Sequence, residues 1–356
     1  MHREDGLGNQ GFLAELELLT RCENPNILRL LGYCVNGPER ILVYEHASNG
    51  SLDDYLNSPD KMINLTWEQR LKMCVGIANG LNYLHKTEGD KNVIIHRDIK
   101  SDNILLDENL EVKIADFGLS IFHPTNHPES TIYTKNFAGT NVYADPEYMK
   151  MGKLKVESDI YSFGVVLFEI LCGKLAYDSF YTNQYEKGLA PVARKHFRKG
   201  TIMEMVDGNL MNEAHELSST LRIGPDQRSL DAFCKVAHEC LAETQVSRPK
   251  MKVIDEELKK ALQFQNISFV PSLVNTRDFG YVFVPPKFEP KDFGSWKERM
   301  LLHIVGVEPY LMTILTVGPY VPTYVQRTPG ATLEAPEIVT DLVNQRSNGL
   351  MMSGDW

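Results

Sequence analysis

The sequence predicts an α+β fold in which one helix and a β-hairpin precede a longer, mainly helical part. Apolar residues at helical spacing between Gly11 and Leu19 indicate the first helix. Two strand-like runs, 27–33 and 40–44, lie on either side of a turn at 36–38 and indicate the hairpin. This order separates a small strand-bearing part of the chain from a larger helical part.

Three later helices have clear signals in the sequence. A short helix starts at Ser51, a favoured N-cap residue, and continues to Leu56. A longer helix is predicted over 66–85, because Thr66 and Gln69 have the spacing of a capping box. The segment 159–171 is almost entirely apolar, so we expect a helix that is buried on every side.

Composition limits the classes of protein to which the chain can belong. Apolar residues make up 43% of it, which is enough to fill a core, and no run reaches the roughly 18 apolar residues that a membrane span needs. The six cysteines stand singly without C-x-x-C spacing, which indicates neither a zinc site nor a disulfide framework. A formal charge of −10 and a pI near 5.5 argue against general nucleic-acid binding. A folded cytoplasmic protein with reduced thiols fits these observations.

The composition changes near residue 263, and we place a domain boundary there. Prolines and aromatic residues are frequent in 263–294, which indicates an extended linker. A small helical segment, 295–345, is expected to follow, and the end of the chain, 346–356, is expected to be disordered.

Two motifs in the helical part carry chemistry. The first is His96-Arg97-Asp98-Ile99-Lys100-Ser101-Asp102-Asn103, and Asp116-Phe117-Gly118 begins thirteen residues after Asn103. Phosphoryl transfer requires a carboxylate that orients the acceptor, a second oxygen ligand for metal, and a carboxylate that holds Mg²⁺ against the nucleotide phosphates. Asp98, Asn103 and Asp116 supply these three groups. Two other Asp-Phe-Gly tripeptides, at 278–280 and 292–294, lack the upstream motif and are interpreted as chance matches.

In their order and spacing these motifs resemble the catalytic loop and the magnesium motif of protein kinases. Four more segments resemble the plant receptor-like protein kinases in particular. They are the hinge at 42–52, the end of the activation segment at 139–148, the central buried helix at 158–169 and the closing motif at 247–249. The resemblance implies a bilobal protein-kinase-like fold over residues 1–262, with an incomplete N-terminal lobe in 1–47 and a mainly helical C-terminal lobe in 48–262.

The resemblance implies catalytic roles for Asp98, Lys100, Asn103 and Asp116, of which Asn103 and Asp116 would bind Mg²⁺. Lys100 is similar to the lysine that steadies the γ-phosphate in serine/threonine kinases. Its presence favours serine or threonine over tyrosine as the acceptor.

The resemblance also implies structural roles for His96, Arg97, Phe117 and Gly118 within the two motifs. Asp159 would hold the backbone of the catalytic loop. Glu147 and Arg248 would form the buried ion pair that ties the activation segment to the helical lobe, although Asp145 stands where the family motif has alanine.

Nucleotide contacts are implied for residues of the hinge-like segment and the first helix. Tyr44 falls at the position that guards the adenine pocket, and backbone groups from Glu45 to Ala47 would contact the adenine edge. Glu15 matches the helix glutamate that pairs with a phosphate-binding lysine. A tyrosine at the end of a strand is also a common core residue, which is the alternative for Tyr44.

Hydroxyl residues are frequent between the Asp-Phe-Gly motif and Glu147, near an arginine, Arg97, that in this family can pair with a phosphorylated activation loop. The candidate phosphorylation sites are Ser130, Thr131, Tyr133, Thr134 and Thr140. For each of them the alternative is an ordinary solvated loop rich in hydroxyl groups.

The front end of the nucleotide site departs from the family pattern. The first lysine of the chain is Lys61, beyond the hinge, so no lysine is expected to pair with Glu15. Gly6-Leu-Gly8-Asn-Gln-Gly11 has the spacing G-x-G-x-x-G, but a helix follows at once, and we interpret the segment as a flexible connector. Without preceding strands the hairpin would keep an uncovered apolar face. We therefore expect weak binding of ATP and Mg²⁺.

Two functions follow from these observations. The first is a receptor-like serine/threonine protein kinase, truncated at its N-terminus, that transfers the γ-phosphoryl group of ATP to protein hydroxyls. The alternative is a catalytically impaired pseudokinase that acts as an interaction scaffold for a protein substrate or a partner kinase. Either would act in the cytoplasm, or at the inner face of the plasma membrane through partners. The segment 295–345 resembles the gag polypeptide of copia-type retrotransposons, with an ordinary packing helix as the alternative.

Overall fold

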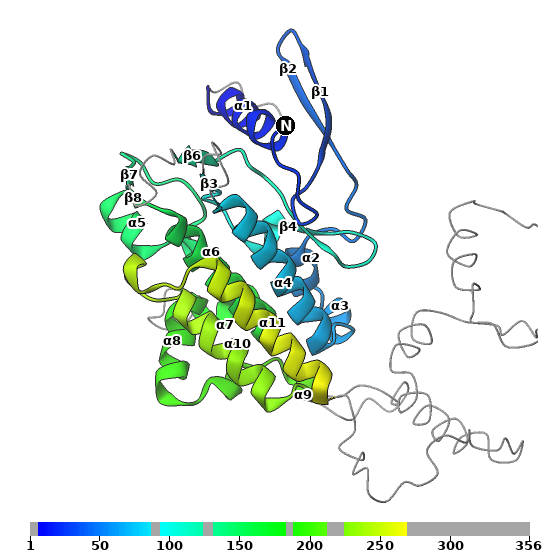
Figure 1. Ribbon diagram of the computed structural model, residues 1–356, viewed down its shortest axis with the longest axis vertical. Coiled ribbons are helices and arrows are strands. Elements are labelled where there is room, and N and C mark those ends of the chain that lie inside the picture. Colours follow the sequence, from blue (N-terminus) through cyan, green and yellow to red (C-terminus); the bar gives the residue numbers. More distant parts are fainter. Residues whose placement is uncertain (1–5, 87–92, 124–130, 183–187, 212–223, 269–356) are drawn as a thin grey trace, which may run out of the picture. The chain divides into compact units, whose positions relative to one another are not determined.

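The computed structural model describes residues 6–86, 93–123, 131–182, 188–211 and 224–268 (Figure 1). They belong to a compact unit that spans Met1–Val274, and a second unit, Asn275–Trp356, lies outside the described residues. The predicted segment 295–345 and the predicted tail 346–356 therefore also lie outside them. Within the described residues, no helix is both long enough and apolar enough to cross a membrane.

The N-terminal part consists of a helix and an antiparallel hairpin, as the sequence predicts. Helix α1 (Gly6–Leu19) precedes strands β1 (Leu30–Asn36) and β2 (Glu39–Tyr44), which pair with each other (Figure 1). The prediction of a flexible connector at 6–11 is wrong, because these residues form the first turns of α1. Gly11 of α1 lies against the backbone of Gly118 in the Asp-Phe-Gly segment, and a Cβ there would make an ordinary contact, 3.5 Å from the Gly118 carbonyl oxygen.

The hairpin exposes large apolar side chains, in agreement with the expected uncovered face. Their exposed fractions are between 48% and 58%, and the residues are Leu31, Tyr33, Val35, Ile41 and Val43. An isolated two-stranded hairpin is marginally stable in water, and three or more strands or a packed helix are normally needed. Helix α1 packs on both strands of this hairpin.

The rest of the described chain is mainly helical. Its longer helices are α4 (Trp67–Leu84), α6 (Val156–Cys172), α8 (Leu189–Lys199), α10 (Gln227–Cys240) and α11 (Met251–Ser268). The shorter ones are α2 (Leu52–Leu56), α3 (Pro59–Ile63), α5 (Pro146–Met151), α7 (Ser179–Thr182) and α9 (Gly208–Met211). Single 3₁₀ turns form η1 (Ser101–Asn103), η2 (Asn141–Tyr143), η3 (Ile202–Met205) and η4 (Gln245–Ser247).

Short strands pair in three further antiparallel ladders. They are β3 (Val93–Ile95) with β6 (Ile121–His123), β4 (Ile104–Leu106) with β5 (Val112–Ile114), and β7 (Ile132–Tyr133) with β8 (Lys153–Leu154). In the β4–β5 ladder, Ile104 lies opposite Ile114. The residue before β4 and the residues after β5 therefore meet at one end of the ladder.

Helix α6 is the centre of the core, and every residue from Ser158 to Cys172 is buried. Helix α4 begins at the predicted capping box of Thr66 and Gln69 and packs against α11, which also lies along α10 (Figure 1). The helix predicted from its serine cap, α2, also begins as expected after Ser51.

The helical unit extends past the boundary predicted at residue 262. Helix α11 continues to Ser268, because its last turns still pack on the domain. Gln265 is buried, and its Oε1 accepts the backbone N–H of Asp226, 2.8 Å away, at the start of α10. The prediction that an extended linker begins at 263 is therefore wrong for residues 263–268.

Candidate active site

The catalytic-loop motif follows β3 and is held by a buried histidine. His96 is fully buried, which lowers its pKa and favours the neutral imidazole. Its Nε2 lies 3.1 Å from the carbonyl oxygen of Ala115, and its Nδ1 accepts the N–H of Asp98 at 3.3 Å. The His96 ring also packs edge-on against Phe117, with centroids 4.8 Å apart. This residue thus links the two motifs directly.

Asp159, at the start of α6, anchors the backbone of this loop. Its two oxygens accept the N–H groups of His96 and Arg97, each at 2.9 Å, and Nε2 of His85 lies 2.8 Å from Oδ2. Arg97 has φ 74°, a conformation that non-glycine residues adopt only when their surroundings enforce it. The expected contact between Asp159 and the loop backbone is present.

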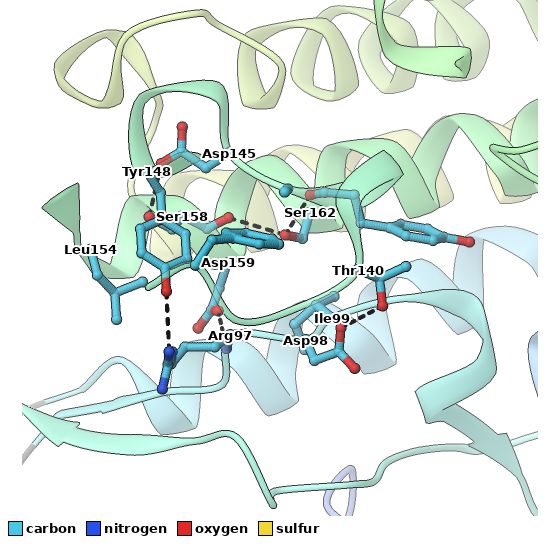
Figure 2. A pocket seen from close by; sticks show the side chains of 13 residues that line it. Arg97, Asp98, Ile99, Thr140, Asp145, Tyr148, Leu154, Ser158, Asp159 and Ser162 are labelled. Carbon is cyan, nitrogen blue, oxygen red and sulfur yellow. Dashed lines mark hydrogen bonds between the residues drawn. The ribbon is translucent and has the colours of Figure 1, made fainter. Parts of the chain in front are cut away.

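Asp98 contacts three polar side chains, of which Figure 2 shows Thr140. Its Oδ1 accepts the hydroxyl of Thr140 at 2.8 Å. Its Oδ2 lies 3.3 Å from the amide nitrogen of Asn103 and 3.6 Å from Nζ of Lys100. Lys100 also contacts Asp102 at 3.3 Å. The carboxylate is therefore fixed in direction while it stays at the surface of a pocket that Arg97 and Thr140 help to line.

Asn103 and Asp116 lie on either side of the same ladder end. Asn103 precedes β4, Asp116 follows β5, and the N–H of Ala115 donates to the carbonyl oxygen of Asn103 at 2.9 Å. Asp116 is exposed with φ 62°, and its Oδ1 accepts the N–H of Gly118 at 3.4 Å. Asp98 and Asp116 both raise the pKa of Lys100, against the opposing effect of its burial. The structure thus brings the three predicted oxygen-bearing groups together.

Glu15 points from α1 toward the Asp-Phe-Gly segment. Its Oε1 accepts the N–H of Phe117 at 3.3 Å, and the hydroxyl of Tyr44 is hydrogen-bonded to the same side chain. Burial raises the pKa of Glu15 and, together with the nearby carboxylate, the pKa of Tyr44 as well. No ion pair between Glu15 and a lysine or arginine is found among the described residues. The glutamate is held by a phenol and a backbone amide instead.

The hinge-like segment is partly committed to contacts within the chain. The N–H of Glu45 donates to the carbonyl oxygen of Arg29 at 3.0 Å. The Glu45 carboxylate in turn accepts the N–H of Arg29 at 2.9 Å. Lys113 lies 3.6 Å from the same carboxylate. The carbonyl oxygen of Ala47 accepts the N–H of Gly50 at 3.4 Å. Of the groups expected to contact adenine, the Glu45 N–H is thus already occupied.

The predicted ion pair between Glu147 and Arg248 is wrong, because Asp145 takes the place of the glutamate. Arg248 Nη2 lies 2.7 Å from Asp145 Oδ1, and both side chains are fully buried. Glu147 instead accepts Nζ of Lys153 at 2.9 Å and the N–H of Gln245 at 2.8 Å.

The sequence at the start of α5 explains why Asp145, and not Glu147, pairs with Arg248. Pro146 begins the helix and Asp145 is its N-cap residue, with Oδ1 accepting the N–H of Glu147 at 3.0 Å. Its Oδ2 accepts Ser158 Oγ at 2.8 Å and Gln245 Nε2 at 2.7 Å. Burial raises the pKa of Asp145, but these hydrogen bonds and the charge of Arg248 outweigh it, and the net pKa is lowered. The carboxylate in place of the family's alanine was the signal for this pair.

The candidate phosphorylation sites occupy different surroundings. Tyr133 is 73% exposed, whereas the Thr140 hydroxyl is bound to Asp98. Thr134 Oγ1 lies 3.5 Å from the hydroxyl of Tyr148, which also accepts Nη2 of Arg97 at 3.1 Å. Thr131 is half-buried, and Ser130 lies outside the described residues.

Sequence reasoning missed one buried chain of hydrogen bonds. The hydroxyl of Tyr143 donates to Glu169 at 2.6 Å, and Ser101 Oγ lies 3.0 Å from the same hydroxyl. A single glutamate within the apolar run 159–171 was the available signal.

Comparison with known proteins adds a family context to this geometry. A family model described as protein tyrosine and serine/threonine kinase matches residues 2–258. Three receptor-like protein kinases of Arabidopsis thaliana, HERK 1, THESEUS 1 and ANXUR2, are each 40% identical to the chain, over 254, 261 and 263 residues. The matches cover 71% to 74% of this chain and 28% to 29% of those proteins. The chain thus spans less than a third of the length of these relatives.

Proposed function

The chain belongs to the receptor-like protein kinases of plants, and on that premise we propose that it transfers the γ-phosphoryl group of Mg-ATP to serine or threonine hydroxyls of proteins. The observation that carries this proposal is the convergence on Asp98 of Thr140, Asn103 and Lys100. Asp98 orients the acceptor hydroxyl and accepts its proton, because its carboxylate is held in one direction by Thr140, Asn103 and Lys100. Lys100 steadies the negative charge of the transferred group.

The residues present fit a magnesium ion. Asp116 is exposed, and its carboxylate makes only one weak described hydrogen bond, at 3.4 Å, which leaves oxygen lone pairs for a cation. The amide nitrogen of Asn103 is engaged with Asp98, which leaves its side-chain oxygen as the group for metal. Magnesium is commonly held by one or two protein oxygens and completed by water and phosphate oxygens. When bound, the ion would neutralise charge on the phosphates during transfer.

The nucleotide end of the site is weaker than the acceptor end. Glu15 is bound to Tyr44 and Phe117 rather than to a lysine, and the first lysine in the sequence is Lys61. Loss of one charge-assisted contact typically costs about 1.5–3 kcal/mol. Low ATP affinity of the 356-residue chain is part of the proposal.

A second candidate function is an interaction scaffold that transfers nothing. Two observations favour it. Among the described residues Glu15 forms no ion pair with a lysine or arginine, and the hairpin exposes its large apolar side chains. Exposed apolar surface of this kind commonly marks a protein interaction site. Protein partners, in the cytoplasm or at the inner face of the plasma membrane, are part of either proposal.

A transfer assay with radiolabelled ATP and Mg²⁺ distinguishes the two candidates. Its variants are Asp98→Asn and the matched control Asp60→Asn, which changes an exposed carboxylate in α3. We expect slow transfer by the chain and by Asp60→Asn, and none by Asp98→Asn. Transfer that is equally fast with Asp98→Asn would refute the proposed role of Asp98. No transfer even at millimolar ATP, with the fold intact, would favour the scaffold.

A further inference from the structure

Glu169 is a buried carboxyl group to which the proposed mechanism assigns no role. It lies in α6 with no exposed surface. Its Oε1 accepts the hydroxyl of Tyr143 at 2.6 Å and the N–H of Ala176 at 2.7 Å. Its Oε2 is buried and has no hydrogen-bond partner in the structure. The Ser101 hydroxyl also interacts with the Glu169 carboxyl group and lowers its pKa, but less than burial raises it. Oε1 is thus fully satisfied, whereas Oε2 lacks a hydrogen bond of normal geometry.

The surroundings of Glu169 disfavour a negative charge. No lysine, arginine or histidine among the described residues forms an ion pair with it, and Asp53 adds electrostatic repulsion. A buried carboxylate without a cation or a full set of hydrogen-bond donors is costly, so such groups normally take up a proton. In agreement, burial raises the pKa of Glu169 to about 8. A proton on Oε2 would remove the charge without disturbing the two bonds that Oε1 accepts.

We propose that Glu169 is held as a neutral carboxylic acid and serves as a positioning residue that fixes the catalytic loop, and that its ionisation releases this hold. Because the Tyr143 hydroxyl donates to Glu169, the hydroxyl of Ser101, 3.0 Å away, donates to Tyr143. The chain of hydrogen bonds therefore runs from the core helix α6 through η2 to η1.

This chain reaches Asp98 from two sides. Ser101 follows Lys100 in the catalytic loop and is fully buried. Tyr143 ends η2, whose N-cap residue, Thr140, donates its hydroxyl to Asp98 at 2.8 Å. An ionised Glu169 would draw water or move away from its apolar surroundings, and either change would loosen both attachments. The effect on phosphoryl transfer rests on the proposed kinase function, whereas the protonation of Glu169 does not.

Few other groups that face Glu169 change charge between pH 6 and pH 9. Tyr143 of η2, Tyr181 of α7 and Tyr177 between α6 and α7 all have pKa values raised by burial, so they stay neutral. Burial likewise raises the pKa of Cys172 on α6 to about 12. Asp53 of α2 has a raised pKa as well. The Asp53→Asn variant is therefore the control that shows whether a pH effect comes from Asp53 rather than from Glu169.

The first test measures melting temperature against pH for the full chain and its Glu169→Gln variant, which mimics the neutral acid. The pKa of Glu169 in the folded chain, about 8, lies above its ordinary value of 4.5. The folded state therefore binds the extra proton, and the wild-type chain should lose stability relative to Glu169→Gln as pH rises from 4.5 to about 8. Above pH 8 the difference should be constant. Parallel curves for the two proteins throughout this range would overturn the proposal.

Two further measurements do not depend on whether Glu169→Gln folds. Tyr143→Phe removes a hydrogen bond that lowers the pKa of Glu169, so the plateau should begin at a higher pH than in the wild type. In the wild-type chain, infrared spectra should show a protonated-carboxyl band at pH 6 that disappears above pH 8. An unchanged plateau in Tyr143→Phe, or no such band at pH 6, would count against the neutral acid.

The positioning role is tested by amide exchange and by transfer. Exchange of the segment 139–144, corrected for the intrinsic effect of pH, should accelerate above pH 8 in the wild type but not in Glu169→Gln. Transfer should fall by up to about tenfold per pH unit over the same range, again only in the wild type. An identical alkaline fall in both proteins would refute the positioning role. If exchange responds as expected and no protein transfers phosphate, the inference stands and the proposed kinase function fails.

Discussion

The buried pair of Asp145 and Arg248 should account for a large part of the stability of the helical unit. Both side chains are fully buried, and removal of one partner leaves an uncompensated charge, which typically costs about 3–5 kcal/mol. The perturbation is Asp145→Asn, which keeps the shape of the side chain and removes its charge. In Glu147→Gln the contact that is weakened, with Lys153, is partly exposed, so we expect a much smaller effect.

The expected shift in melting temperature is large enough to measure by calorimetry. For domains of roughly 150–250 residues, 1 kcal/mol corresponds to about 2–4 °C, so Asp145→Asn should lower the melting temperature by roughly 6–20 °C. Glu147→Gln is the matched control, because it lies in the same helix and also accepts a backbone N–H. The reasoning would be refuted by equal shifts in the two variants, or by a larger shift in Glu147→Gln.

A double-mutant cycle separates the pair from other effects at the N-cap of α5. Asp145 also accepts bonds from Ser158 and Gln245, so a single substitution disturbs more than the ion pair. Arg248→Gln and the double variant complete the cycle. If the ion pair dominates, the double variant should be less destabilised than the sum of the single variants. Additive effects would mean that the N-cap contacts, and not Arg248, explain the loss.

Three more predictions follow from the site. Thr140→Val should lower kcat by about 10- to 100-fold at nearly constant KM for ATP, because it removes a hydrogen bond to a charged group, Asp98, worth about 1.5–3 kcal/mol; an unchanged kcat would contradict this. Tyr44→Phe should accelerate amide exchange at Phe117, since Glu15 loses the phenol that helps to hold it; equal exchange rates would show that Tyr44 is not needed. The pKa of Asp145 is lowered in the folded state, so its stabilising effect is present above its ordinary pKa of 3.8 and is lost at lower pH. Melting curves of the wild type and Asp145→Asn should therefore converge in acid, and a constant difference below pH 4 would contradict the assignment.

The parts of the site that the sequence predicted depend on local spacing. The separation between Asn103 and Asp116 is set by one short hairpin, β4–β5, so the motif alone implied that these residues meet. The contact of Asp159 with the loop backbone followed from the resemblance of 158–169 to the central buried helix of receptor-like kinases. A serine cap predicted the start of α2 and a capping box that of α4, because both signals depend on residues within one helical turn.

The errors arose where contacts with segments distant in the sequence, rather than local spacing, decide the structure. Asp145 and Glu147 are two residues apart, and the choice of which carboxylate faces Arg248 is made by the N-cap geometry of α5 together with Ser158 and Gln245. The family motif favoured Glu147, and the acidic residue at position 145 was the local signal that a second carboxylate could compete for Arg248. The first turns of α1 were missed because three glycines have low helix propensity, and local sequence therefore favoured a connector. The link from Glu169 to Ser101 joins segments far apart in the sequence, which periodicity cannot reveal.

The catalytic loop around Asp98 is held more firmly than the nucleotide end around Glu15. This difference bears on whether ATP binding or orientation of the acceptor hydroxyl limits phosphoryl transfer. Around Asp98 the loop is fixed by Asp159 of α6, by Thr140 and by Asn103, each through a hydrogen bond shorter than 3 Å. At the nucleotide end, Glu15 relies on a 3.3 Å bond to Phe117 and on Tyr44, while the hairpin beside it exposes its apolar side chains. Regions with few buried contacts open at lower free energy than the core. Under the proposed kinase function we therefore expect nucleotide binding, rather than orientation of the acceptor, to be the weaker step.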